Sequence, residues 1–406
     1  MAISSPVNVT IEGHAPDIYK KTCPPVVCFG DSDWWYHNRG HMDIQLMRRF
    51  ARLTKVLYVN SIVVRKFNVC EGSMFFRRFV RKMRSIFKGL KPSGIENLMI
   101  YSPFTMPVHH IPLVRRFNHD ILNYQILYQM RRLGFSNPLV WVTCPAAAPV
   151  AVNLARTKLV YQRSDCYEQL PGVDSAQVEK YDKLLKKHAD LVIYVNKEFM
   201  AREINDCKKA LFLDHGVDYE FFAGALENSY IPPEMQQIPH PILGFYGNID
   251  EHTTDISLVE KVACLLKDFS IVLVGNSSLN LSSLASRRNV YLLGQKPYDQ
   301  IPHYAKCFDV CFMPWQQNEW IQACNPIKLK EYLALGKPIV STPFKELGSY
   351  DGLVMVAPDA ASFADAVIKT FRQNCPELIS QRQSRVSGST WDVKARRVLR
   401  ALWQAE

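Results

Sequence analysis

The chain has 406 residues, more than one ordinary hydrophobic core supports, and this length predicts two domains of roughly 150 to 200 residues. Hydrophobic residues make up 48% and charged residues 21%, and no apolar run approaches the roughly 18 to 20 residues that cross a bilayer, which excludes a membrane-spanning protein. The net charge of +11 is concentrated in the first third of the chain and favours an anionic partner.

The N-terminal tail and the cysteines carry no targeting or metal-binding pattern. Residues 1–23 contain Glu12 and Asp17 and lack the apolar segment of a secretory signal, so we expect a cytoplasmic protein. The eleven cysteines are scattered and include no C-x-x-C pair, so we expect no metal and no other cofactor.

The first predicted strand leads into a loop that is rich in candidate site residues. Residues 24–29 form a short apolar run typical of a buried parallel strand, and residues 42–53 follow with helical spacing. A loop after such a strand lies at the carboxyl edge of the sheet, where open α/β folds bind ligands. We predict an acceptor or cleft site here, although the two tryptophans could equally anchor the loop; its residues are Trp34, Trp35, His37 and Arg39.

Residues 65–91 interleave apolar and basic side chains. Phe75, Phe79, Met83 and the pair at 86–87 recur at helical spacing, which gives one apolar and one cationic face. This pattern favours a helix lying on an anionic bilayer surface over an ordinary amphipathic helix. A nucleic-acid site is less favoured because the apolar face is continuous. The predicted membrane contacts are Phe75, Phe76, Arg77, Arg78, Phe79, Arg81 and Lys82.

Strand and helix patterns alternate through the rest of the first half, which predicts a parallel sheet. The strand patterns lie at 55–60, 98–101, 138–144, 158–163, 190–196 and 211–214, and the helical patterns at 117–133, 146–154 and 176–188. Asp165 follows the strand pattern at 158–163, so its carboxylate could act as a general base at the sheet edge or merely cap a turn.

The second half repeats this alternation after a linker. Residues 224–241 are rich in proline and polar residues and predict the interdomain linker. Strand patterns follow at 242–246, 270–274, 289–293 and 309–315, with a helix at about 255–266. No G-x-G-x-x-G follows the strands that end at Phe29 and Tyr246, and no G-x-x-x-x-G-K-[ST] occurs, so nicotinamide and ATP sites lose their usual support.

Residues 325–341 predict a helix followed by a short strand. Asn325 is a good N-cap, Pro326 suits the first helical position, and Gly336 ends the helix.

The start of this helix has the chemistry of an anion site. Its free N–H groups and dipole attract an anion, and Lys328 adds a full charge in the first turn. Glu331 supplies acceptors suited to vicinal hydroxyls, so the layout fits a diphosphate plus a ribose. An ordinary surface helix with a Glu–Lys pair is the alternative.

Several of these stretches together resemble the GT-B glycosyltransferases, and the resemblance covers most of the chain. The nucleotide-binding half carries it at 244–248, 275, 293–294, 305–314 and 325–340, and the first half at 29–41, 161–165 and 216–218. The likeness is strongest to bacterial teichuronic-acid-type and xanthan-type exopolysaccharide glycosyltransferases, including membrane-associated glucuronosyltransferases.

The resemblance implies an α/β fold of two Rossmann-like domains that face each other across a cleft. The implied parts are an acceptor-binding domain at 24–223, a nucleotide-sugar-binding domain at 242–375, and a helical segment at 376–406 that returns to the first domain.

The resemblance also implies roles for the donor-binding residues. Lys328 would contact the diphosphate, Glu331 the ribose hydroxyls, and residues 296–298 the base. The implied donor site comprises Asn248, Lys296, Tyr298, Asn325, Lys328 and Glu331.

Related retaining enzymes carry a second glutamate eight residues before the first, and that position is Ala323 here. Donor-sugar recognition would then fall to Asn325, Gln316 or Gln317. The departure favours an inverting reaction in which Asp165 deprotonates the acceptor, with His41 as the second candidate base.

We therefore predict a peripheral-membrane glycosyltransferase at the inner face of the cell membrane. It would move a sugar from a UDP-linked donor to a polyprenyl-diphosphate-linked saccharide, without metal or nucleic acid, and a monomer would suffice. The alternatives are a nucleotide-sugar epimerase of the same fold and an inactive sugar-nucleotide-binding subunit.

Overall fold

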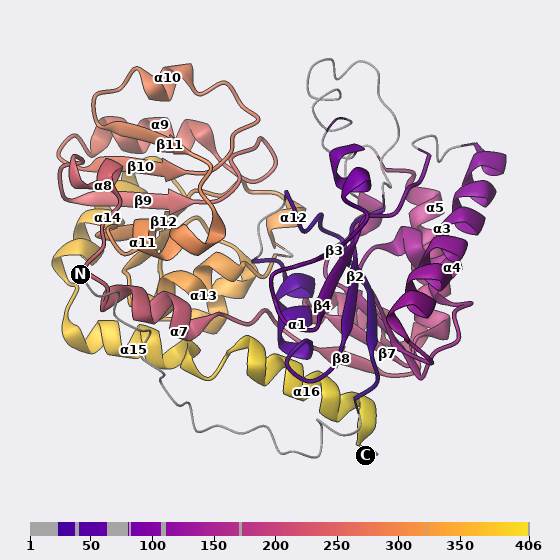
Figure 1. Cartoon of the computed structure of the whole chain (residues 1–406). Helices are drawn as coiled ribbons and strands as arrows, with labels where there is room; N and C mark the ends of the chain where they lie inside the picture. The colour runs from indigo at the N-terminus through magenta and orange to yellow at the C-terminus, as the bar shows by residue number, and fades with distance from the viewer. Residues whose placement is uncertain are drawn as a thin grey trace, which may run out of the picture. The chain divides into compact units, whose positions relative to one another are not determined.

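The computed structural model shows an α/β protein with two sheets flanked by helices (Figure 1). It describes residues 23–36, 40–62, 80, 83–106, 111–169, 173–322 and 324–404. The described residues form two compact units. The first lies within Met1–Trp35, Met47–Gln162 and Cys166–Asp190, and the second within Tyr36–Leu46, Arg163–Asp165 and Leu191–Glu406.

The first sheet has eight strands in the order β3-β4-β2-β1-β5-β6-β7-β8. β1 pairs in parallel with β2 on one side and β5 on the other, and β3 runs antiparallel to β4. The strands are β1 Val26–Phe29, β2 Val56–Val59, β3 Leu90–Pro92, β4 Leu98–Tyr101, β5 Leu139–Val142, β6 Lys158–Arg163, β7 Leu191–Tyr194 and β8 Ala210–Phe212.

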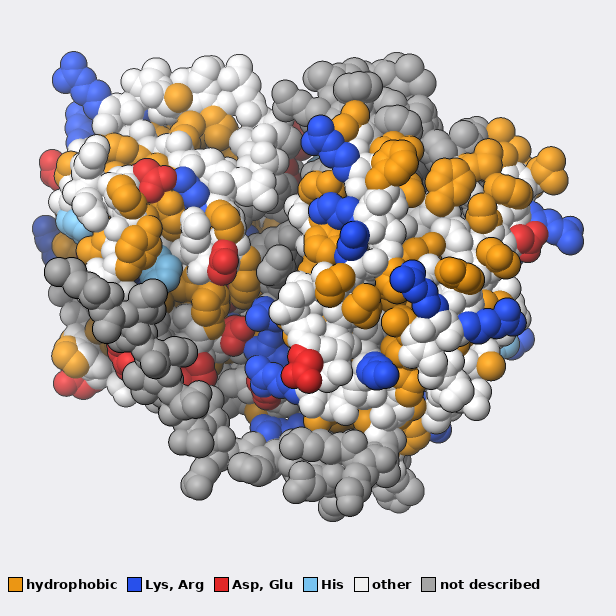
Figure 2. All heavy atoms as spheres, viewed as in Figure 1, with side chains coloured by type: hydrophobic (Ala, Val, Ile, Leu, Met, Phe, Trp, Pro, Cys, Tyr) orange, Lys and Arg blue, Asp and Glu red, His pale blue; other side chains and the backbone are white. Residues whose placement is uncertain are grey.

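The helices of this half follow the predicted alternation. They are α1 Met42–Phe50, α3 Pro112–Leu133, η2 Pro145–Ala147, α4 Ala148–Ala151, η3 Tyr167–Gln169, α5 Ser175–His188, α6 Lys197–Glu203 and η4 Ile204–Asp206. Helix α3 begins five residues earlier than predicted because Pro112 suits the first turn, and Gly134 closes it in the left-handed conformation at φ 70°. Hydrophobic side chains, with lysine or arginine side chains among them, gather over the face that carries α3 (Figures 1 and 2).

The second sheet has six strands in the order β11-β10-β9-β12-β13-β14, and every strand pairs in parallel with its neighbours. The strands are β9 Ile242–Tyr246, β10 Ser270–Val274, β11 Val290–Gly294, β12 Val310–Met313, β13 Ile339–Ser341 and β14 Met355–Val356. The two largely parallel sheets confirm the predicted fold class.

The helices around the second sheet are α7 Tyr219–Ala223, η5 Gly224–Leu226, α8 Pro233–Gln236, α9 Ile256–Leu265, α10 Ser282–Ala285, η6 Tyr298–Gln300, α11 Ile301–Ala305, α12 Glu319–Gln322, α13 Ile327–Ala334, η7 Lys345–Tyr350, α14 Ala360–Arg372, α15 Pro376–Ser387 and α16 Trp391–Trp403.

A separate hydrophobic cluster covers each face of this sheet. The side chains of α9 and α14 pack in one cluster, and those of α11 and α13 pack in the other. Leu329, Tyr332 and Leu333 of α13 are fully or almost fully buried there, which fixes the helix against the sheet.

The predicted N-cap of α13 is wrong. The helix begins at Ile327 with Pro326 in the extended cap position, and no side chain caps it. Proline has fixed φ and here keeps the extended ψ of 126°, so the helix starts one residue later than the pattern indicated.

The helices in the described part of the chain include none that is both long and apolar enough to cross a membrane.

Candidate active site

Lys328, in the first turn of α13, is the central cation of the candidate site. Its ammonium nitrogen lies 4.9 Å from the centre of the Phe245 ring and 5.4 Å from that of the Trp315 ring. Burial lowers the pKa of Lys328, and Glu331, Cys324 and Asp250 oppose this. Among the described residues, no hydrogen bond or ion pair engages the ammonium group. It is therefore a partly buried cation placed to bind an anion.

Two glycines at the carboxyl ends of β9 and β10 make room for this lysine. A Cβ atom at Gly247 would lie 2.7 Å from the Lys328 Nζ atom, and one at Gly275 would lie 1.7 Å from the carbonyl oxygen of Gly247. Only glycine at both positions lets the two strand ends and the lysine approach this closely.

Glu331, one turn further along α13, is held by two tyrosines. Tyr246 donates a hydrogen bond of 2.5 Å to Oε2, and Tyr298 donates one of 2.9 Å to Oε1. The side chain is buried, and burial raises the pKa of Glu331 to about 7 although the two tyrosines and Lys328 lower it. Each carboxylate oxygen keeps capacity for a further donor, as recognition of a vicinal diol requires.

Two buried N–H donors beside the start of α13 have no protein partner among the described residues. They are Nδ2 of Asn325 and the indole Nε1 of Trp315. A buried donor without an acceptor costs about 1–3 kcal/mol, so such groups indicate a ligand or a water molecule. The sequence predicted Asn325 but not Trp315, because a tryptophan at the end of an apolar run is typical of a core residue.

The loop after β9 contributes Asn248 and Asp250. Asn248 is exposed, and its amide donates a hydrogen bond of 2.5 Å to Asp250. Asp250 also accepts from the main-chain N–H groups of His252 and Thr253, which orders the loop. Asn248 lies two residues after Tyr246, the last residue of β9.

Only part of the predicted base-binding loop faces Glu331. Tyr298 donates to this carboxylate, and its ring packs against Phe221 at 5.9 Å between centroids. Lys296 instead forms an ion pair of 2.6 Å with Glu234. The structure therefore brings Tyr298 into the site and engages Lys296 elsewhere.

Asp165, the predicted base, lies within the second unit beside α12. The indole of Trp320 donates a hydrogen bond of 3.1 Å to its Oδ1 atom. Burial raises the pKa of Cys324 to about 12, with Asp165 raising it further and Lys328 lowering it. Cys324 is thus within electrostatic reach of both the predicted base and the central cation.

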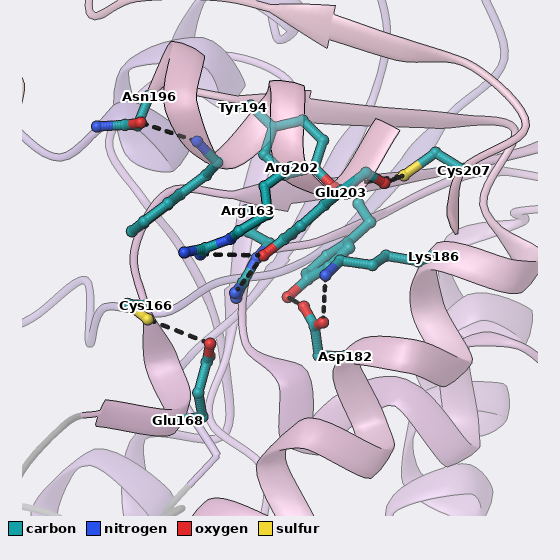
Figure 3. A network of polar contacts seen from close by, with 12 residues as sticks. Arg163, Cys166, Glu168, Asp182, Lys186, Tyr194, Asn196, Arg202, Glu203 and Cys207 are labelled. Atoms are coloured by element: carbon teal, nitrogen blue, oxygen red, sulfur yellow. Dashed lines mark hydrogen bonds and ion pairs between the residues drawn. The ribbon is translucent and has the colours of Figure 1, made fainter. Parts of the chain in front are cut away.

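Arg163 ends β6, two residues before Asp165, and pairs with Glu203 (Figure 3). Its guanidinium donates two hydrogen bonds to Glu203, from Nε at 2.9 Å and from Nη2 at 3.1 Å. Both side chains are buried, so this bidentate pair is rigid. A further Arg163 nitrogen donates to the carbonyl oxygen of Asp165 at 3.3 Å.

The residues predicted around the first loop lie in different settings. Trp34 is buried and packs edge-on against Tyr58 at 5.4 Å, which favours the alternative that it anchors the loop. Trp35 is partly buried, with the Lys88 ammonium 4.4 Å from its ring centre. His41, the second candidate base, is exposed.

Some predicted positions lie outside the described residues. They are His37, Arg39, Ala323 and the membrane contacts Phe75, Phe76, Arg77, Arg78, Phe79, Arg81 and Lys82. Within the described ranges, no three His, Cys, Asp or Glu residues are grouped so that they could hold a metal ion.

Comparison with known sequences identifies relatives of about half the chain. Residues 240–373 match the family described as Glycosyl transferases group 1. TuaH of Bacillus subtilis (strain 168), which carries the name of a teichuronic acid biosynthesis glycosyltransferase, is 26% identical over 221 residues. This match covers 50% of the chain and 55% of TuaH, so it spans about half the length of that relative.

Solved structures share the fold over nearly the whole chain. The sucrose-phosphate synthase of Thermosynechococcus elongatus has a TM-score of 0.65 at 16% identity, covering 93% of this chain and 98% of its own. HepE of Anabaena, in complex with UDP-glucose, has a TM-score of 0.65 at 13% identity, covering 94% and 100%. Together with the sequence matches, these likenesses confirm the predicted resemblance to GT-B glycosyltransferases.

Proposed function

We propose that this chain is a GT-B glycosyltransferase that transfers a sugar from a UDP-linked donor to a lipid-linked saccharide in bacterial surface polysaccharide synthesis. One observation carries the proposal. A single turn of α13 joins a partly buried lysine, which has no hydrogen-bond or ion-pair partner among the described residues, to a carboxylate held by two tyrosines, at the carboxyl edge of β9. A diphosphate can bind to the cation and the helix start, and ribose hydroxyls can donate to the carboxylate.

Lys328 and the start of α13 would bind the donor diphosphate. The lysine supplies a full positive charge, and the helix dipole supplies a partial one. Both lie in a partly desolvated site, where they stabilise the charge that develops on the leaving nucleoside diphosphate. Glu331 would accept hydrogen bonds from the ribose hydroxyls. The structure of HepE with UDP-glucose supports a UDP-linked donor for this fold.

Asn325 and Trp315 would recognise the donor sugar or its phosphates. Their unpaired N–H groups lie next to Lys328 in the chain or in space, so a bound donor would supply the missing acceptors. This assignment gives donor recognition a source other than a glutamate at position 323, which is alanine in this sequence.

Asp165 would act as the base of an inverting displacement. The acceptor hydroxyl oxygen bonds to C1 of the donor sugar as the bond from C1 to the diphosphate oxygen breaks. The hydroxyl proton passes to the Asp165 carboxylate, and the bonding electron pair leaves with the nucleoside diphosphate. Trp320 would orient the carboxylate, because its indole donates to Oδ1.

The acceptor and the location are inferred from the relatives and from the charge. TuaH is named for teichuronic acid biosynthesis, and the net charge of +11 suits an anionic lipid surface. We infer a peripheral association with the inner face of the cell membrane.

The test measures nucleoside diphosphate release from a panel of UDP-sugars, with and without membranes that contain lipid-linked acceptors. Wild type is compared with Lys328→Met, Asp165→Asn and the control Lys345→Met, which removes an exposed lysine paired with Glu198. Lys328→Met should weaken donor binding about 10- to 100-fold. Asp165→Asn should lower turnover at least about 100-fold with donor affinity unchanged.

Contrary outcomes discriminate among the alternatives. Near-normal turnover of Asp165→Asn would refute the base and direct attention to His41. Conversion of the donor to an isomeric sugar without acceptor would identify an epimerase. Donor binding without consumption under any condition would identify a sugar-nucleotide-binding subunit.

A further inference from the structure

Helix α3 of the first unit carries apolar side chains on two faces. Its inner face is buried through Leu122, Ile126 and Met130. Its outer face exposes a second set, with Leu113 78% and Tyr124 70% exposed. We call this set the outer stripe; it comprises Leu113, Phe117, Tyr124 and Tyr128.

The spacing of the outer stripe places it on one side of the helix. Its residues fall at i, i+4, i+11 and i+15, which is the repeat of a single helical face. A helix on the surface of a protein in water normally presents polar residues on that face. A row of large apolar and aromatic side chains there marks a binding surface.

The charges around the outer stripe are almost all positive. Helix α3 contains four arginines and one acidic residue, Asp120. The neighbouring segment 83–91 adds Arg84, Lys88 and Lys91 and has no acidic residue. A partner that covers this surface must therefore accept both apolar side chains and a cationic border.

Hydrogen bonds join α3 to a second exposed segment at the end of β4. The Gln125 side chain accepts from the N–H of Phe104 and donates to its carbonyl oxygen, each at 2.9 Å. Ser102, on the same segment, bonds to Ser85 at 2.9 Å. The exposed rings of Phe104 and Phe87 are thus carried by segments that are tied to one another and to α3.

We propose that the outer stripe, with Phe104 and Phe87, docks on a bilayer that contains anionic lipids. Leucine and phenylalanine side chains would enter the boundary between headgroups and acyl chains, and the tyrosine hydroxyls would stay at headgroup level. The arginines would pair with lipid phosphates. A second copy of the chain is a poorer occupant, because two such surfaces would bring eight arginines of α3 together with two aspartates.

This inference rests on the proposed function only in that a lipid-linked acceptor requires the enzyme at a bilayer. Phe87 belongs to the amphipathic segment 65–91, but the four residues of the outer stripe lie outside it and differ from the predicted membrane contacts at 75–82. The two surfaces can therefore be tested separately.

The experiment measures cosedimentation of the full chain with vesicles of phosphatidylcholine alone or with about one quarter phosphatidylglycerol. The stripe variant is Leu113→Ser/Phe117→Ser/Tyr124→Ser. The charge variant is Arg116→Gln/Arg131→Gln/Arg132→Gln. The matched control replaces exposed apolar residues of the second unit and is Ile204→Ser/Leu226→Ser/Leu265→Ser.

Wild type and the control should sediment with anionic vesicles. With neutral vesicles, both proteins should stay in the supernatant. The stripe variant should bind at least about tenfold more weakly. The charge variant should bind about 100-fold more weakly, and its residual binding should depend less on salt. Transfer to a water-soluble, short-chain acceptor should be unchanged in the stripe variant, whereas transfer to vesicle-borne acceptor should fall.

Three results would overturn the inference. They are binding of the stripe variant at the wild-type level, equal affinity of wild type for neutral and anionic vesicles, and a wild-type dimer in light scattering that the stripe variant converts to monomer. If no sugar is transferred but vesicle binding still requires the stripe, the proposed function fails and the docking surface stands.

Discussion

Replacing Glu331 by glutamine is expected to stabilise the protein near neutral pH while it weakens donor binding. Glu331 is 3% exposed, and its carboxyl group accepts hydrogen bonds from two tyrosine hydroxyls. Burial raises the pKa of Glu331 from its ordinary value of 4.5 to about 7, because the charged form is poorly solvated there. Glutamine has nearly the same shape, still accepts one of these hydrogen bonds, and carries no charge to bury.

The magnitude follows from this difference in pKa. At about 1.4 kcal/mol per pH unit, the difference between 4.5 and about 7 corresponds to about 3 kcal/mol of unfolding free energy. The folded state binds the proton more tightly than the unfolded state. Proton binding by Glu331 therefore adds fully to the unfolding free energy below pH 4.5. This stabilisation falls as pH rises and is lost once pH passes about 7. Glutamine has no such dependence.

The assay compares the thermal midpoint of wild type and Glu331→Gln between pH 4.5 and pH 7.5. Other titrating groups affect both proteins alike and cancel in the difference. The midpoint of the variant relative to wild type should rise by about 6 to 12 °C across this range, for a unit of roughly 200 residues. A difference that stays constant with pH would refute the buried, proton-binding carboxyl group.

Three further predictions address the same unit. UDP affinity should rise about tenfold between pH 6 and pH 8 in calorimetry as Glu331 ionises, and a slope that persists in Glu331→Gln would contradict this. Gly247→Ala should displace the Lys328 ammonium and weaken UDP binding at least about tenfold with uridine binding unchanged; equal losses for both ligands would count against it. Asp214→Asn should lower the unfolding free energy by about 3–5 kcal/mol in urea titration, because two buried lysines lose their carboxylate, whereas the exposed Glu198→Gln should change it by less than about 1 kcal/mol; similar losses would contradict the difference in burial.

The sequence predicts most strands of this protein because each of these strands is a short apolar run between turn residues. β4, β6 and β9 begin and end where the pattern placed them. β3 was not predicted, because Leu90–Pro92 has three residues, one lysine and one proline and lacks the signature of a strand. β3 forms because it pairs with the edge of β4. The local sequence does not show which strand will be available for pairing.

Site residues could be predicted where their chemistry stands out from the fold. Lys328 and Glu331 are charged residues near the start of a helix that leads into a short strand, so the local pattern identified them. Tyr246 and Trp315 end apolar strands and gave no such signal, yet one holds Glu331 and the other lies against Lys328. Their roles depend on which side chains the sheet brings together.

Helix α13 shows how this unit can hold a buried carboxylate and a partly buried lysine in position. Leu333 fixes the helix to the core, and Lys330 is clamped by an ion pair with Asp214. Burial alone would raise the pKa of Asp214, but Lys330 and a second lysine lower it to about 2, so the clamp stays ionised across the working pH range. Lys328 and Glu331 therefore project from a helix that is anchored both by apolar packing and by charge. Because the backbone is already fixed, binding a donor need not order the helix, and more of the interaction with the diphosphate can appear as affinity.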